Sequence, residues 1–248
     1  MLLDIYKDAL EYSMQDKIIL LKLGICMLLS VFIVPLFLVL GYEYRVLDIS
    51  TKGMVNGNEK LPEFNDLVGM FVDGLKVFLV NIVYMIIPIL IYLAFAIASG
   101  GLSNLHSGIG NGIGIFGLIV FIIVLFIFFF MSLMAVTNMV AHDGALKKAF
   151  DFEGIWNIID NIGWFRYVLF YIGLIIAQGV IVALTAIISV ILQVIVVLGL
   201  GGLNAGVASL GSLIITFLVF LVFSLILQPY MSVFRNRALG LIYEPVEE

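Results

Sequence analysis

The chain has 248 residues, of which 63% are hydrophobic and only 12% are charged. This composition lies far outside the usual range of a soluble globular domain, so we expect the chain to fold in lipid. Its formal net charge of −5, with only 12 Lys and Arg residues, excludes the clustered positive charge that nucleic-acid binding requires. Because Cys26 is the only cysteine, an intramolecular disulfide and a cysteine-based metal site are also excluded.

The N-terminal part of the chain leads into a first apolar run. Residues 2–17 carry charges opposite apolar side chains and predict an amphipathic helix in the membrane plane. The apolar run at residues 23–40 has no cleavage site after it, so we interpret it as retained in the mature chain. Its Pro35 leaves two alternatives open. We favour a full span over a re-entrant hairpin that returns to the side from which it entered.

Two long uncharged gaps follow, at residues 77–142 and 167–234. Each gap is too long for one span of about 20 residues, and each contains a stretch rich in Gly, Ser and Asn that predicts a turn. The gaps therefore predict two helical hairpins. With the N-terminal segment they give about five apolar helices, at residues 23–40, 77–98, 115–140, 167–196 and 208–230.

Two segments repeat the pattern of the N-terminus, in which an amphipathic helix ends near a cation before an apolar helix begins. They cover residues 62–76 and 150–166. The cations expected at the membrane boundaries are Lys22, Lys76 and Arg166. We therefore expect an all-α fold, in which residues 1–248 form a single polytopic membrane domain with in-plane amphipathic helices on the cytoplasmic side.

The distribution of Lys and Arg predicts the orientation in the cell membrane. These residues lie in the charged loops and the C-terminal tail, whereas the glycine-rich turns carry none. By the positive-inside rule, the charged loops and the C-terminus are cytoplasmic. The side of the N-terminus stays open, since five spans place it outside but its lysines favour the inside. Trp156 and Trp164 suit interfacial anchoring.

The polar side chains within the predicted spans are neutral. Asn81, Tyr84, Asn138 and Gln178 are the candidates for an intramembrane path for a neutral solute. The alternative is that such groups form interhelical hydrogen bonds, worth about 0.6–2 kcal/mol each, and we favour this interpretation.

The motifs of enzymatic chemistry are missing from the sequence. It contains no nucleophile elbow, phosphate-binding loop, dinucleotide fingerprint or zinc-protease helix. His106 and His142 have no neighbouring His or Cys to complete a metal site. We therefore expect no enzyme, no catalytic residue, no cofactor and no metal.

Three functions remain open at this point. We favour a non-enzymatic scaffold, envelope or partner-subunit protein. The alternatives are a permease or channel for a neutral or apolar solute, and a lipid-handling protein. The expected partners are membrane lipids, with another membrane protein or a second copy of the chain as further alternatives, and no nucleic acid.

Several short motifs occur in a characteristic order: Gly41-Tyr42 with Arg45, Leu61-Pro62-Glu63-Phe64, Asp73-Gly74-Leu75-Lys76, Ala149-Phe150-Asp151-Phe152, and the segment from Arg237 to Tyr243. As a set they resemble the archaeal membrane-protein family catalogued as domain of unknown function 4013, which is common in methanogens. The similarity covers nearly the whole chain. It implies an archaeal cell membrane and one compact membrane domain, and it brings no catalytic residues because the family has no assigned chemistry.

Overall fold

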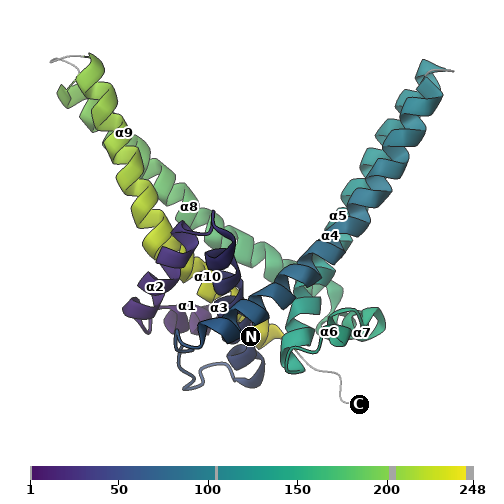
Figure 1. Cartoon of the computed structure of the whole chain (residues 1–248), viewed down its shortest axis with the longest axis horizontal. Coiled ribbons are helices and arrows are strands. Elements are labelled where there is room, and N and C mark those ends of the chain that lie inside the picture. The colour runs from purple at the N-terminus through teal and green to yellow at the C-terminus, as the bar shows by residue number, and fades with distance from the viewer. Residues whose placement is uncertain (1, 104–105, 201–204, 244–248) are drawn as a thin grey trace. The chain divides into compact units, whose positions relative to one another are not determined.

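The computed structural model describes residues 2–103, 106–200 and 205–243. Within these ranges the chain forms helices and no strand, which confirms the all-α fold class. The helices are α1 (Leu2–Ser13), α2 (Lys17–Leu28), α3 (Ile33–Lys52), α4 (Leu67–Ser103), α5 (Ser107–Ala141), α6 (Leu146–Ala149), α7 (Phe152–Ile162), α8 (Trp164–Leu200), α9 (Ala205–Val222), the π-helical turn η1 (Phe223–Leu227) and α10 (Gln228–Ile242) (Figure 1).

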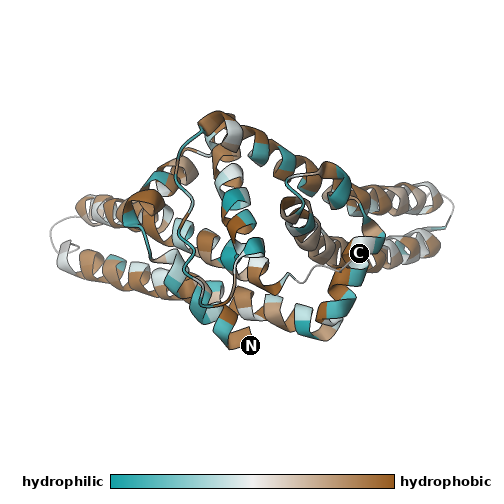
Figure 2. Ribbon diagram, turned by 90° about the horizontal axis from the view of Figure 1, so that it is seen from below, coloured by the Kyte–Doolittle hydropathy of each residue, from teal (hydrophilic) through white to brown (hydrophobic). Residues whose placement is uncertain are grey.

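Four helical stretches in the described part of the chain are long and apolar enough to cross a membrane. They are α4, α5, α8 and the continuous run of α9, η1 and α10. Figure 2 shows hydrophobic residues along these helices, whereas hydrophilic residues gather on the shorter helices and on the loop after α3. The protein is therefore a multi-pass membrane protein, with four spanning helices found where the sequence predicted five.

The missing span is the first apolar segment, residues 23–40, which the structure divides between two helices. α2 ends at Leu28 and α3 begins at Ile33, with a turn over residues 29–32. The 12 residues of α2 rise about 18 Å, well short of the roughly 30 Å of hydrocarbon in a bilayer. Pro35 lies in the first turn of α3, where its missing N–H removes no intrahelical hydrogen bond.

The segment at residues 62–76 also differs from the prediction, because it forms no separate amphipathic helix. α4 begins at Leu67 and continues directly into the span. Its apolar stripe is exposed, with Val68 76% and Val72 46% accessible, whereas Met70 is fully buried. Helical periodicity finds an apolar stripe but does not tell whether protein or lipid covers it.

Close backbone packing selects the buried face of α4. A Cβ atom on Gly41 of α3 would collide with the carbonyl oxygen of Met70, and one on Gly74 would collide with the carbonyl oxygen of Phe37. The two glycines therefore permit the start of α4 to lie directly against α3. Residues 62–66 precede this contact as an irregular segment.

The segment at residues 150–166 contains a helix close to the predicted one. α7 buries Ile155 and Ile159 and exposes Trp156 and Phe152. Gly163 separates α7 from α8 with a φ of +88°, a conformation that favours glycine.

Both hairpins are longer than the sequence predicted. α4 continues to Ser103 and α8 to Leu200, so most of each glycine-rich stretch is helical. Backbone groups in hydrocarbon have no water to bond, which favours helix even at glycines. The 37 residues of α4 span about 55 Å, more than a bilayer core requires. The remainders of the predicted turns, residues 104–105 and 201–204, lie outside the described residues.

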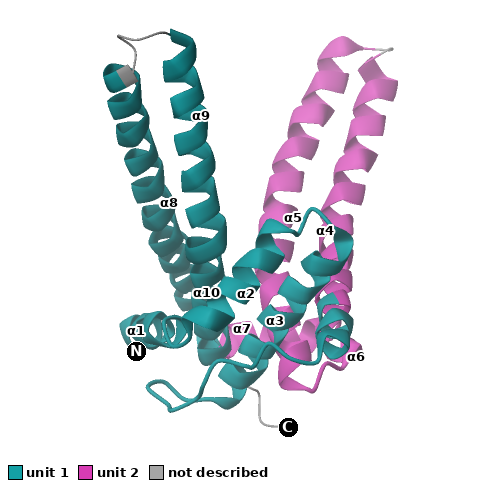
Figure 3. Cartoon of the chain, turned by 60° about the vertical axis from the view of Figure 1, so that its left-hand side comes forward, with its two compact units in different colours: residues 1–74, 162–242 teal, residues 75–161, 243–248 magenta. Residues whose placement is uncertain are grey.

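The chain divides into two compact units (Figure 3). Unit 1 contains Met1–Gly74 and Ile162–Ile242, and unit 2 contains Leu75–Asn161 and Tyr243–Glu248. The single-domain organisation therefore stays a prediction.

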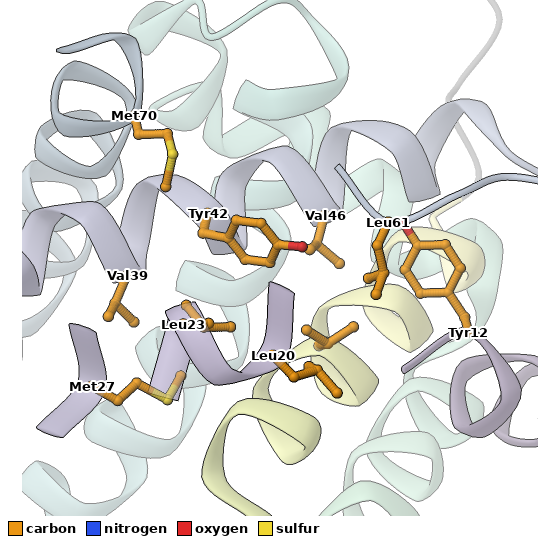
Figure 4. Close-up of a cluster of buried hydrophobic side chains, with 10 residues drawn as sticks. Tyr12, Leu20, Leu23, Met27, Val39, Tyr42, Val46, Leu61 and Met70 are labelled. Carbon is orange, nitrogen blue, oxygen red and sulfur yellow. The ribbon is translucent and has the colours of Figure 1, made fainter. Parts of the chain in front are cut away.

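Unit 1 is built around α10. This helix packs against α1, α2 and α3, while α2 also contacts η1 and α8 runs along α9. Figure 4 shows part of the core, where side chains of α2 meet those of α3. The buried members of this cluster are Tyr12, Leu20, Leu23, Met27, Val39, Tyr42, Val46, Leu61, Met70 and Val233.

Unit 2 consists mainly of the α4–α5 hairpin. Aromatic pairs join the two helices, with ring centroids 5.1 Å apart for Tyr92 and Phe121 and 5.7 Å apart for Phe95 and Phe116. The short α6 packs against α5.

Candidate functional site

A buried charge cluster lies in unit 1, centred on Arg237 of α10. Arg237 is only 1% exposed, and its Nε donates to Oδ1 of Asp8 at 2.7 Å. Its Nη2 donates to Oε2 of Glu59 at 3.0 Å and to the carbonyl of Met54 at 3.2 Å. The guanidinium also lies 4.5 Å from the ring centroid of Tyr12. One side chain thus joins α1, the loop after α3 and α10.

The electrostatics of this cluster depend on burial and on the hydrogen bonds that compensate for it. Burial by itself would raise the pKa of the Glu59 carboxyl. The backbone N–H groups of Glu59 and Met54 and the Arg237 guanidinium donate to it, and together they hold its pKa below its ordinary value. Asp8 is 5% exposed and also accepts from the N–H of Asn56 at 2.6 Å. Burial raises the pKa of Tyr12, whose neutral hydroxyl donates to the carbonyl of Lys60 at 3.1 Å.

A second polar cluster of unit 1 fastens the segment before α4 to α3. Nη1 of Arg45 donates to the carbonyl of Asn65 at 2.7 Å, and Nη2 donates to the carbonyl of Asp66 at 3.2 Å. Tyr42 donates to the carbonyl of Pro62 at 3.1 Å. Asp66 in turn accepts from the N–H of Gly69 at 3.1 Å and so caps the first turn of α4.

A third cluster lies in unit 2 and holds the α6 segment. Tyr84 of α4 donates to the carbonyl of Ala149 at 2.8 Å, and its ring stacks on Phe150 with centroids 6.1 Å apart. Asn138 of α5 donates to the carbonyl of Lys148 at 2.9 Å and accepts from the hydroxyl of Tyr243 at 2.8 Å. Two side chains of the spanning helices are thus used to bind a short loop helix.

The four residues considered for a solute path are all engaged with backbone carbonyls. Tyr84 and Asn138 bind neighbouring carbonyls of the α6 segment, as described above. Asn81 donates to Val77 of its own helix at 2.9 Å. Gln178 lies in unit 1, where it donates to Met231 at 3.3 Å. The structure therefore brings Tyr84 and Asn138 together, and both bind the α6 segment.

The predicted boundary residues occupy different kinds of position. Lys76 lies near the start of α4, and Arg166 lies in the first turn of α8. Lys22 instead lies in the middle of α2, which is not one of the spanning helices. Trp156 is 48% exposed on α7, and Trp164 is the first residue of α8.

Within the described residues, no group of three or more His, Cys, Asp or Glu side chains is arranged to hold a metal ion. Nδ1 of His142 lies 2.8 Å from the carbonyl oxygen of Asn138, one turn earlier in α5.

The family model described as "Protein of unknown function (DUF4013)" matches residues 25–190, which is most of the chain. The chain belongs to this family. The matched region contains both Arg45 and the Tyr84 and Asn138 contacts, whereas Asp8 and Arg237 lie outside it. No curated protein and no solved structure matches the chain. Membership of the DUF4013 family therefore establishes ancestry without assigning an activity.

Sequence reasoning found the motif that contains Arg237 but missed its partner. Asp8 and Arg237 are 229 positions apart, and no spacing rule connects residues at that separation. The sequence did contain one signal, since Arg237 is followed by small and apolar residues up to Tyr243. An arginine that is buried among such residues requires an acidic partner.

Proposed function

We propose that this protein is a non-enzymatic scaffold or partner subunit of an archaeal cell membrane. The observation that carries the proposal is the use of the neutral intramembrane polar groups. Asn81, Tyr84, Asn138 and Gln178 each donate to a backbone carbonyl, so their polar atoms hold the chain together. In a solute path, such polar groups must instead be free to form hydrogen bonds with the passing solute.

The proposed orientation follows from the number of spanning helices. Four spans return the chain to its starting side, so both termini lie on one face. The Lys and Arg residues of the loops assign that face to the cytoplasm. The α2–α3 hairpin then enters the membrane and returns without crossing.

A flux assay tests the scaffold against the permease. The purified protein is reconstituted in vesicles, and the leakage of glycerol and urea is compared with that of protein-free vesicles. The proposal predicts equal leakage, because the four polar side chains considered for a path donate to backbone carbonyls. Solute flux that Asn81→Leu abolishes, while Gln193→Leu on another spanning helix leaves it intact, would overturn the scaffold in favour of a permease.

A turnover assay tests the non-enzymatic part of the proposal. The carboxylates of the segment before α4 are occupied locally, since Glu63 accepts from the amide of Asn65 at 2.8 Å and Asp66 caps α4. We therefore expect no hydrolysis of phospholipids or phosphoesters by the purified chain. Turnover that disappears in Glu63→Gln or Asp66→Asn would contradict this expectation.

A further inference from the structure

A cavity of about 450 Å³ lies in unit 1, between the end of α1 and the start of α2 on one side and η1 and α10 on the other. This volume falls within the range of about 300–1,000 Å³ typical of small-molecule sites. Its lining includes Lys17, Leu20, Leu21, Leu225, Ile226 and Tyr230.

An irregularity of the last spanning helix shapes one wall of the cavity. A regular α-helix would require residue 229 to donate to the carbonyl of Leu225, but Pro229 has no N–H. The chain instead forms the π-helical turn η1, in which the N–H of Gln228 donates to Phe223. At Gly24, α2 lies directly against this turn, since a Cβ atom there would collide with the carbonyl oxygen of Leu225.

One apolar wall of the cavity belongs to a helix long and apolar enough to span the membrane, and the other wall is formed by α2. Ile226 continues the span that begins in α9 and is 55% exposed, and Leu21 of α2 is 47% exposed. A second apolar cavity, of about 340 Å³ between α8 and α9, shares Leu227 with the first. Two adjoining apolar spaces beside a membrane helix suit the hydrocarbon chains of one lipid better than a solute from water.

The charge at the cavity selects among membrane lipids. Lys17 is the one charged residue among the described residues that line it, and its side chain is exposed. The Oδ1 atom of the neighbouring Asp16 caps the start of α2, where it accepts from the N–H groups of Ile18 at 2.8 Å and Ile19 at 3.0 Å. An exposed ammonium at the mouth of an apolar cavity is complementary to an anionic headgroup.

We propose that the cavity between α2 and the η1–α10 segment binds an anionic membrane lipid, with its hydrocarbon chains against Leu21 and Ile226 and its headgroup against Lys17. Tyr230 supplies a hydroxyl at the same cavity. A bound lipid is compatible with a scaffold and with a permease, so lipid binding and solute flux can fail independently.

Lipid retention measured by native mass spectrometry tests the proposal. The full chain is purified in detergent and exposed to phosphatidylglycerol or phosphatidylcholine with identical chains. We expect phosphatidylglycerol to be retained about fivefold more than phosphatidylcholine, the ratio expected for one lysine near an anionic headgroup. Lys17→Gln should remove that preference, and Leu21→Trp should reduce retention of both lipids by filling the cavity.

Matched controls are available on the same helix. Lys22→Gln removes an exposed cation of α2 that does not line the cavity, and Ile25→Trp enlarges an exposed apolar residue that does not line it either. Both should retain lipid as the unaltered protein does. The proposal is overturned if Lys22→Gln loses the preference equally, if Leu21→Trp retains lipid unchanged, or if inorganic phosphate displaces the lipid at equal concentration.

Discussion

Among single residues, Arg237 shows how this chain accommodates a charge in a nearly dry environment. Its guanidinium is buried against two carboxylates and an aromatic ring, and these contacts come from three separate parts of the chain. A buried ion pair adds little net stability, but removing one partner leaves an uncompensated charge. The cluster therefore matters most for keeping α1, the loop after α3 and α10 in one arrangement.

The two carboxylates of the cluster should differ in importance. Asp8 is almost fully buried, whereas the side chain of Glu59 is 24% exposed. Asp8→Asn should lower the free energy of unfolding by about 3–5 kcal/mol, and Glu59→Gln by about 1 kcal/mol or less. Both changes in stability can be measured by thermal unfolding in detergent, with dye labelling of the Cys26 thiol as the readout. Equal effects of the two substitutions would contradict the assigned burial.

Acid should weaken the cluster through Glu59. Its pKa is lower in the folded chain than its ordinary value, so its contribution to stability is fully present above the ordinary value of about 4.3. That contribution is lost as pH falls from there through the lowered pKa of the folded state. The thermal transition of the unaltered protein should therefore decrease below about pH 4 more steeply than that of Glu59→Gln. Parallel pH profiles would exclude Glu59 as the group responsible.

At the scale of elements, the contact between α3 and α4 depends on the absence of side chains. Gly74→Ala places a methyl group against the carbonyl of Phe37 and should cost about 1–3 kcal/mol. Gly100→Ala, in the same helix, meets nothing within 4 Å and should be neutral or stabilising by about 0.5–1 kcal/mol. Thermal unfolding of the two variants compares them directly, and a neutral Gly74→Ala would show that the helices are not in backbone contact.

The α2–α3 hairpin is the other element with a distinctive surface. Val31 and Phe32 of its turn are 90% and 66% exposed, and Ile33 at the start of α3 is 70% exposed, which is unfavourable in water and favourable in lipid. In a Cys26→Ser background, Ser30→Cys at this turn should react slowly with a water-soluble maleimide from either side of the membrane. Asn58→Cys, on the exposed loop after α3, should react rapidly once the membrane is opened. Rapid labelling of Ser30→Cys from outside would instead indicate a crossing segment.

At the scale of the whole molecule, an even number of spans has a direct consequence. With four spanning helices, an N-terminal tag and a C-terminal tag should both resist protease added to intact cells and both be cut once the cells are opened. A fifth span at residues 23–40 would expose the N-terminal tag alone. The experiment therefore tests the re-entrant hairpin independently of the labelling at its turn.

Much of the candidate site follows from tertiary contacts that no local pattern encodes. Tyr84 and Asn138 were recognisable as polar groups in apolar segments, but their shared use around α6 was not. The exposed stripe of α4 is the converse case, where the apolar pattern was recognised but the separate in-plane helix predicted for it does not form. In lipid an apolar side chain is equally stable facing outward, so periodicity no longer distinguishes core from surface.

Composition and charge placement by themselves determined that this is an all-helical, multi-pass membrane protein, because backbone groups in hydrocarbon must be hydrogen-bonded within the chain and helices achieve this. Only the tertiary structure decided that residues 23–40 divide between two helices and that α4 begins without a separate amphipathic helix. The same holds for the pairing of Arg237 with Asp8. The hydropathy pattern allows several arrangements of the helices equally. Glycine contacts and a buried ion pair between distant segments, together with the local π-helical turn, select one of them.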